Sequence, residues 1–276
     1  MSTQTKSSTS LDTPYHLSSE QAADFQRDGH VLLRGLCSAE EIAKYRPILN
    51  SATERFRTEN RPMEERDTYG KAFLQIMNLW VRDEDVRRYV LAKRFGKAAA
   101  DLLGVDAVRL YHDQALYKEP NGGHSPWHQD QYYWPLDTKG IQTVTMWMPL
   151  VDVSIEMGAL TFASGSHADG FMGHIKISDE SEDTFNAFVK ERGYKVTNAE
   201  MRAGDATFHS GWTLHCAPGN QSETMREVMT IIYFADGIRA MEPDNPNRAD
   251  DLAGWLPGIK PGELAASPLN PVVWRR

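Results

Sequence analysis

The pattern of polar and apolar residues divides the chain into a helical first part and a β-rich second part, with the change near residue 105. Two Ser-x-x-Gln or Ser-x-x-Glu sequences have capping-box spacing, in which the serine and the residue three positions later satisfy backbone N–H groups at a helix start. They predict helices from about Ser18 to Gly29 and from about Ser38 to Arg57. A third helix is expected from about Asp83 to Leu103, with Gly104 beyond its end.

Two short apolar stretches lie between these helices. Residues 30–35 are expected to form a short strand closed by a glycine. Residues 73–80 form a dense apolar run, which is either part of the core or one wall of a pocket.

From residue 105 onward, short β-like runs alternate with Gly, Pro, Asn and Asp. Several short strands with turn residues between them are typical of a sandwich or barrel rather than of a parallel α/β sheet. An acidic stretch at 180–193 is expected to be a helix between strands. The predicted strands are 108–118, 141–151, 158–163, 206–209 and 227–235.

This division gives one expected domain over residues 15–276. It consists of a helical part at about 15–104, a β-rich core at about 105–235 and an irregular C-terminal cover at 236–276. Residues 1–14 are rich in Ser and Thr and have little to bury, so we expect a disordered tail. The sequence has no internal repeat.

Composition narrows the class of partner. A formal net charge of −8 with interspersed charges argues against nucleic acid or an anionic membrane surface, and leaves a small-molecule substrate as the expected partner. Two cysteines cannot form a disulfide framework, and no apolar stretch is long enough to span a membrane. We therefore expect a cytoplasmic protein; the sequence carries no signal for an oligomeric state.

Candidate chemistry begins at His128 and Asp130. In an extended segment these two side chains project to the same face while Gln129 points away. An imidazole and a carboxylate on one face are two ligands of a metal site, and the 2-His-1-carboxylate arrangement suits non-haem Fe(II). A hydrogen-bonded structural pair is the alternative.

Three histidines are candidates for the third ligand. His215 is the main candidate and His209 its competitor. Both are far from His128 in the sequence, but this separation does not exclude them, because distant strands meet in a barrel. His124 would share a helical face with His128, but the flanking Gly122, Gly123 and Pro126 argue against a helix there.

Arg226 opens the strand-like run 226–234, in which it shares a face with Val228 and Thr230. A guanidinium at the end of a largely apolar face is costly unless a carboxylate meets it. The partner is either an Asp or Glu of the protein or the carboxylate of a bound cosubstrate, which a guanidinium binds in bidentate fashion.

A set of motifs keeps its order over roughly residues 105–235. The set consists of His128-Gln129-Asp130 followed by aromatic residues, Met146-Trp147-Met148-Pro149-Leu150, Asp152 before Gly158-Ala159-Leu160, Ser164-Gly165-Ser166-His167, Gly204-Asp205 with His215, and Arg226 eleven residues after His215. In this order the chain resembles the phytanoyl-CoA dioxygenase family of Fe(II)- and 2-oxoglutarate-dependent oxygenases. The resemblance implies a mainly β fold with flanking helices around a double-stranded β-helix (jelly-roll, cupin-like) core.

The resemblance also implies the roles of the site residues. It makes His128, Asp130 and His215 the catalytic iron ligands and Arg226 the partner of the distal carboxylate of 2-oxoglutarate. Trp147 looks like the family tryptophan beside the cosubstrate.

The position of a further polar cosubstrate contact stays open between Gln114 and Lys118. One departure concerns Ala217, because some relatives carry a carboxylate-binding serine two residues after the distal histidine. Alternation along the predicted strand 141–151 places Thr143, Thr145 and Trp147 on one face. Either this face or the opposite one should point into the barrel.

Aromatic residues that flank the expected ligands are candidate substrate contacts, although aromatic clusters also form cores. They are Tyr132, Tyr133, Trp134 and Trp212.

The expected function is that of a dioxygenase which uses Fe(II), 2-oxoglutarate and O2, hydroxylates a small organic molecule and converts 2-oxoglutarate to succinate. Related halogenases have a small residue at the carboxylate position, so the retained Asp130 favours hydroxylation. Alternatives are desaturation or ring formation at the same centre, or a cupin-like metal- or ligand-binding protein without oxygenase activity.

Overall fold

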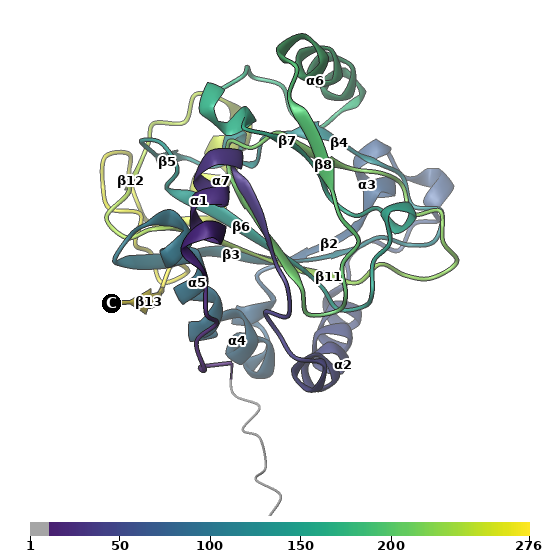
Figure 1. Ribbon diagram of the computed structural model, residues 1–276, viewed down its shortest axis with the longest axis horizontal. Coiled ribbons are helices and arrows are strands. Elements are labelled where there is room, and N and C mark those ends of the chain that lie inside the picture. Colours follow the sequence, from purple (N-terminus) through teal and green to yellow (C-terminus); the bar gives the residue numbers. More distant parts are fainter. Residues whose placement is uncertain (1–10) are drawn as a thin grey trace, which may run out of the picture.

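Two antiparallel β-sheets face each other across a central cavity in the computed structural model, which describes residues 11–276 (Figure 1). The larger sheet has the strand order β1 (His30–Leu33), β9 (Ala206–Ser210), β6 (Thr143–Pro149), β11 (Val228–Ala235), β3 (Ala107–Tyr117) and β13 (Val272–Arg275), and β2 (Leu74–Met77) also pairs with β3. The smaller sheet has the order β4 (Ser125–His128), β10 (His215–Ala217), β7 (Thr161–Ser164) and β8 (Lys195–Asn198). This is the expected jelly-roll core.

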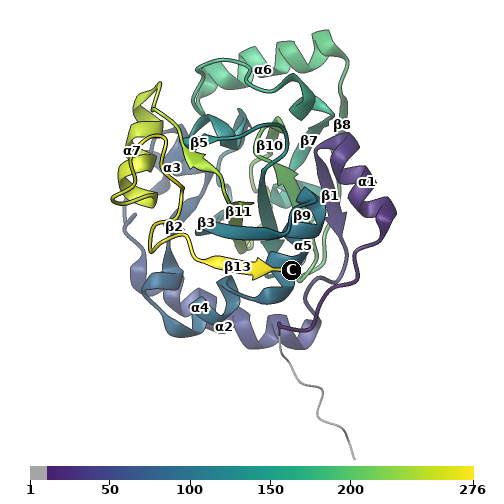
Figure 2. The same cartoon turned by 90° about the vertical axis from the view of Figure 1, so that its left-hand side faces the viewer.

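Helices cover the outer side of the larger sheet (Figure 2). They are α2 (Ala39–Phe56), α4 (Glu84–Val90) and α5 (Lys93–Leu103), with α1 (Ser19–Asp28) beside β1. The short α3 (Thr68–Ala72) precedes β2, and α6 (Asp179–Arg192) packs against β4. A two-stranded ribbon of β5 (Leu136–Asp137) and β12 (Arg239–Ala240) precedes α7 (Pro246–Trp255).

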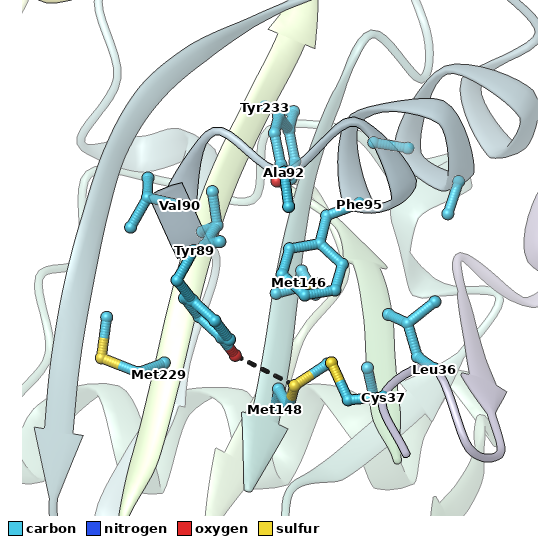
Figure 3. Close-up of a cluster of buried hydrophobic side chains, with 14 of the residues drawn as sticks. Leu36, Cys37, Tyr89, Val90, Ala92, Phe95, Met146, Met148, Met229 and Tyr233 are labelled. Carbon is cyan, nitrogen blue, oxygen red and sulfur yellow. Dashed lines mark hydrogen bonds between the residues drawn. The ribbon is translucent and has the colours of Figure 1, made fainter. Parts of the chain in front are cut away.

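Alternation along β6 separates the core from the cavity. Val144, Met146 and Met148 belong to the hydrophobic cluster shared with α2, α4 and α5. Figure 3 shows this cluster, in which the hydroxyl of Tyr89 donates a hydrogen bond to Met148 Sδ at 3.0 Å. The other face of β6, with Thr145 and Trp147, lines the central cavity. Of the two faces predicted for this strand, the threonine and tryptophan face is therefore the interior one.

The capping boxes locate two helix starts correctly. Ser18 and Ser38 are the N-caps of α1 and α2, and each box is complete. The single helix expected over 83–103 is wrong, because Leu91 and Ala92 leave the helical conformation between α4 and α5. The backbone N–H of Arg94, in the first turn of α5, is satisfied by the carbonyl of Leu11.

Both ends of the chain differ from the sequence expectation. Of the predicted tail, residues 1–10 lie outside the described residues, but Leu11 is only 4% exposed and packs into the core, so the prediction is wrong for residues 11–14. The C-terminal cover is not wholly irregular, since it contains α7 and β13. Within the described part of the chain, no helix combines the length and apolar character needed to cross a membrane.

Candidate functional site

The first two candidate ligands lie at the end of β4. His128 is the last residue of this strand, and Asp130 begins a 3-10 turn over Asp130–Tyr132, so Asp130 lies just beyond the strand. Gln129 between them is still extended, with φ −116° and ψ 124°. The two side chains therefore project to the same side, with 3.6 Å between His128 Nε2 and Asp130 Oδ1.

The third candidate ligand comes from the neighbouring strand. His215 opens β10 and lies directly opposite His128 in the antiparallel register. Directly opposed residues place their side chains on the same face of a sheet, and the two imidazole ring centroids are 4.1 Å apart. His215 Nε2 lies 3.7 Å from Asp130 Oδ1. The candidate ligand atoms of His128, Asp130 and His215 all lie within 4.8 Å of one another.

Backbone carbonyls orient both imidazoles. His128 Nδ1 lies 2.7 Å from the carbonyl oxygen of Pro126, and His215 Nδ1 lies 2.9 Å from that of Thr213. A carbonyl only accepts, so each Nδ1 carries the proton and each Nε2 has a free lone pair directed at the cluster.

The charges in the cluster suit a divalent cation. Burial, together with the neighbouring His128 and His209, holds the pKa of His215 well below its ordinary value of 6.5, so this ring is neutral. Burial alone would raise the pKa of Asp130, but the surrounding imidazoles of His215, His128 and His209 compete with it for a proton and hold its pKa well below the ordinary value, so the carboxylate is ionised. Two imidazoles and one carboxylate, with an open side toward the cavity, match the donor set of a non-haem iron site.

His209 contacts the same carboxylate from a different direction. Its Nε2 lies 3.2 Å from Asp130 Oδ2, and the hydroxyl of Thr145, its cross-strand partner, donates to the same oxygen at 2.8 Å. These two contacts hold Oδ2 and leave Oδ1 toward the imidazoles of the cluster. His124 is exposed before β4 and is not part of the cluster.

Arg226 and Lys118 form a cationic pair at one end of the cavity. They pair across β-bridge hydrogen bonds of 2.9 Å in each direction, and both side chains are almost fully buried. The guanidinium donates to the carbonyls of Gly158 (2.6 Å) and Leu116 (3.5 Å), while its Nε has no hydrogen-bond partner in the described part of the chain. The Lys118 ammonium donates to the carbonyl of Gly123 at 2.5 Å.

These two cations have no carboxylate partner within the described residues. Burial lowers the pKa of Arg226 to about 9, so the guanidinium stays charged at neutral pH. Burial together with the Arg226 charge lowers the pKa of Lys118 to about 6, so Lys118 becomes a full cation at neutral pH only with an anion beside it. The structural ion pair considered for Arg226 is therefore absent from the described part of the chain. An anion bound beside the pair would supply the missing charge.

The cavity between the sheets has a volume of about 240 Å³. The three candidate ligands, Arg226, Trp147 and Gln114 all line it, and the guanidinium carbon lies 5.3 Å from the Trp147 ring centre. Gln114 accepts a hydrogen bond from the Gln75 side chain at 2.5 Å.

Only half of the aromatic candidates reach this cavity. Tyr133 and Trp134 line it. Tyr132 and Trp212 are not among the lining residues, and the Tyr132 hydroxyl is bonded to Asn247 at 3.1 Å.

Several lining residues were not singled out from the sequence. Phe73, Gln75 and Met77 come from the apolar run 73–80, which is thus a pocket wall in part. Ser125, His112 and Asp251 also line the cavity. Ser125 lies three residues before His128 and pairs with Ala217, but its role depends on strand register, and Asp251 lies on a helix that the sequence pattern did not predict.

Comparisons with known proteins agree with this geometry. The family model "Phytanoyl-CoA dioxygenase (PhyH)" matches residues 25–228. A curated relative, the phytanoyl-CoA dioxygenase domain-containing protein 1 homolog of Dictyostelium discoideum, is 23% identical over 89% of this chain and 98% of its own length.

Two solved structures from nogalamycin biosynthesis share the fold. The non-haem alpha-ketoglutarate-dependent carbocyclase SnoK is 23% identical with a TM-score of 0.76, covering 94% of this chain and 98% of its own. The epimerase SnoN, in complex with Fe3+, alpha-ketoglutarate and nogalamycin RO, is 26% identical with a TM-score of 0.74, covering 92% and 97%.

Proposed function

The chain belongs to the phytanoyl-CoA dioxygenase family of Fe(II)- and 2-oxoglutarate-dependent oxygenases, and on this premise we propose that it hydroxylates a small organic molecule. The observation that carries the proposal is one cavity that holds both a carboxylate with two imidazoles and a buried guanidinium that has no carboxylate partner among the described residues. A cupin-like binding protein has no need for the second feature.

Iron would be held by His128, Asp130 and His215. Bound there, iron with 2-oxoglutarate and O2 supplies the oxidising chemistry that yields succinate, CO2 and an oxidised substrate. Thr145 and His209 hold the free oxygen of the Asp130 carboxylate, which keeps the other oxygen directed at the metal position. Retention of this carboxylate supports hydroxylation over halogen transfer. Ring formation or epimerisation stays the second candidate, because the similar SnoK and SnoN are a carbocyclase and an epimerase.

Arg226 and Lys118 would together bind the distal carboxylate of 2-oxoglutarate. Both are buried basic side chains without a carboxylate partner among residues 11–276, and Trp147 packs against the guanidinium. We therefore assign the open polar contact to Lys118. Gln114, which hydrogen-bonds Gln75, forms a wall of the cavity nearer the metal.

Ser125 would supply the hydroxyl that Ala217 lacks. The two residues are cross-strand partners of β4 and β10, and both line the cavity. Ser125 Oγ lies 3.4 Å from Lys118 Nζ, so it stands beside the cationic pair. A hydroxyl on β4 can thus reach the same 2-oxoglutarate carboxylate as a hydroxyl at the paired position on β10.

Tyr133 and Trp134 would form the substrate side of the cavity. The Tyr133 hydroxyl is fixed by the backbone N–H of Ile177, which closes the cavity from the loop before α6. Their apolar surface excludes water around the reacting groups.

The test is succinate formation by purified protein with Fe(II), ascorbate and 2-oxoglutarate, with and without candidate substrates. Asp130→Ala is expected to abolish turnover, and His124→Ala, an exposed histidine outside the cluster, is the matched control. Wild-type protein that neither forms succinate nor binds 2-oxoglutarate would exclude the oxygenase function.

A further inference from the structure

The cavity has a further carboxyl group, that of Asp251 on α7, which the chemistry described above does not use. The Tyr111 hydroxyl donates to Asp251 Oδ2 at 2.8 Å, and Trp255 Nε1 donates to Oδ1 at 3.2 Å. Both donors are neutral, and each oxygen keeps further acceptor capacity.

A β-bulge in β3 builds this part of the cavity. Ile231 pairs with Asp113 and Tyr233 with Leu110, so Tyr111 and His112 together oppose Ile232 alone. The extra residue bends the strand and changes which side chains face the cavity. His112 lines the cavity, and its ring lies 4.9 Å from that of Tyr111 and 5.3 Å from that of Trp255.

Asp251 has no cationic partner within residues 11–276. The Arg248 guanidinium, three residues earlier on α7, is bonded to Asp244 at 2.9 Å and to the Gln131 carbonyl at 3.1 Å. His112 is neutral, because burial lowers its pKa to about 3, and the adjacent Asp250 is a further acid. Burial raises the pKa of Asp251 to about 7, as expected for a carboxyl that lacks a compensating charge.

Asp251 lies far from the cationic pair. It contacts Tyr111, whereas Arg226 contacts the carbonyl of Leu116, five residues further along β3. At about 3.3 Å per residue this separation is roughly 16 Å. His112, Gln114 and Leu116 line the cavity between these ends, and Asp130 is close enough to His112 to act on its charge. The metal position therefore lies between the cationic pair and Asp251.

We propose that Asp251 is a specificity-determining residue that binds a protonated amine of the substrate, so that the substrate is a small ring-bearing amine. This inference rests on the proposed function, in which 2-oxoglutarate occupies the cationic end and leaves the Asp251 end to the substrate. An ammonium group supplies both the hydrogen bond and the charge that the carboxylate lacks, whereas an alcohol supplies only the former. An anionic group would meet a carboxylate with no cation to offset it. Tyr133 and Trp134 supply apolar walls for the ring.

The test compares three near-isosteric probes, namely benzylamine, benzyl alcohol and benzoate. Each is titrated by calorimetry, without O2, into protein loaded with Fe(II) and 2-oxoglutarate. Benzylamine is expected to bind at least tenfold more tightly than benzyl alcohol, with benzoate weakest. Asp251→Asn is nearly isosteric, and the Tyr111 hydroxyl can accept a hydrogen bond from the amide, so the variant should keep its shape but lose the preference for the amine. Asp250→Asn, the same change on the exposed side of α7, is the control and should keep it.

Wild-type protein gives a second test that needs no variant. Between pH 6 and 8 benzylamine stays protonated while Asp251, with a pKa of about 7, ionises. The affinity for benzylamine should therefore rise about tenfold over this range, and the affinity for benzyl alcohol should not.

The loading step separates the two hypotheses. Failure of the wild-type protein to bind 2-oxoglutarate overturns the proposed function and this inference together. Normal 2-oxoglutarate binding with equal affinity for the amine and the alcohol, or an amine preference that survives Asp251→Asn, overturns this inference alone.

Discussion

Single atoms decide whether the candidate ligands can bind a metal. The carbonyls of Pro126 and Thr213 direct the two Nε2 atoms, and Thr145 and His209 fix one oxygen of Asp130. The two carbonyl contacts are local, because each carbonyl lies two residues before its histidine, but they form only in the backbone conformation of these strand ends. The contacts of Thr145 and His209 depend on which strands are neighbours. The sequence therefore identifies the ligands, through the order of their motifs, but not the groups that orient them.

Loss of the Thr145 hydroxyl should weaken metal binding. Thr145→Val removes the 2.8 Å hydrogen bond to Asp130 while keeping the shape of the side chain. Changes at groups that orient metal ligands typically reduce metal affinity by about 10- to 100-fold. An anaerobic Fe(II) titration measures the effect. Thr143→Val is the control: Thr143 lies on the same strand as Thr145, and its buried hydroxyl donates to Gln131 rather than to Asp130. Equal Fe(II) affinity in wild type and Thr145→Val would contradict the orienting role.

The hydroxyl at Ser125 should be exchangeable with one at Ala217. Ser125→Ala is expected to weaken 2-oxoglutarate binding about fivefold, which corresponds to one hydrogen bond of about 1 kcal/mol. Adding Ala217→Ser should restore the affinity, because the two positions are cross-strand partners in the cavity wall. Calorimetry with metal-loaded protein measures both steps. A double variant no better than Ser125→Ala would exclude this exchange.

Elements were predictable where local signals decide them. The capping serines located α1 and α2, and β-like runs located most strands of the larger sheet. The break between α4 and α5 was missed because the satisfying carbonyl comes from Leu11, about 80 residues away. The helix that carries Asp251 was missed because its stretch shows little apolar periodicity, although Asn245 caps its start and Pro246 is its first residue. Leu252 and Trp255 pack it against the cluster around Trp134 and Leu136.

The buried carboxyl of Asp113 joins β3 to the turn after β2 and should make stability depend on pH. It accepts hydrogen bonds from the backbone N–H groups of Leu79 and Trp80, and burial raises its pKa from 3.8 to about 7. The folded protein thus binds this proton more tightly than the unfolded chain. The resulting stabilisation is fully present below about pH 3.8 and is lost as the pH rises through 7.

Asp113→Asn removes this titration. Relative to wild type, the unfolding free energy of the variant is expected to increase by about 2 to 3 kcal/mol between pH 5 and pH 8. Denaturant unfolding at both pH values measures the difference. Asp137→Asn controls for the removal of a carboxyl from the surface. A difference between Asp113→Asn and wild type that is the same at both pH values would contradict a buried, titrating carboxyl.

At the scale of the whole molecule, two sheets enclose one cavity with a cationic pair at one end and a carboxyl at the other. His128 and His215 meet because β4 and β10 are neighbours, which the family resemblance implied and local sequence patterns did not. The choice between Lys118 and Gln114, and the role of Ser125, required the register of strands on both sheets. The Asp251 end of the cavity could not be predicted without the bulge in β3 and the helix α7.

The central claim is that the cluster and the cationic pair form one site, in which metal and 2-oxoglutarate bind together. It is tested most directly by titrating Fe(II)-loaded protein with 2-oxoglutarate in the absence of O2 and following visible charge-transfer absorption, which requires chelation of the metal. We expect a saturable band with 1:1 stoichiometry in wild type. Asp130→Ala should lose the band, and Arg226→Gln should keep it with at least tenfold weaker affinity, since one charge-assisted contact contributes about 1.5 to 3 kcal/mol. A wild-type protein that binds Fe(II) but shows no such band at saturating 2-oxoglutarate would contradict the account.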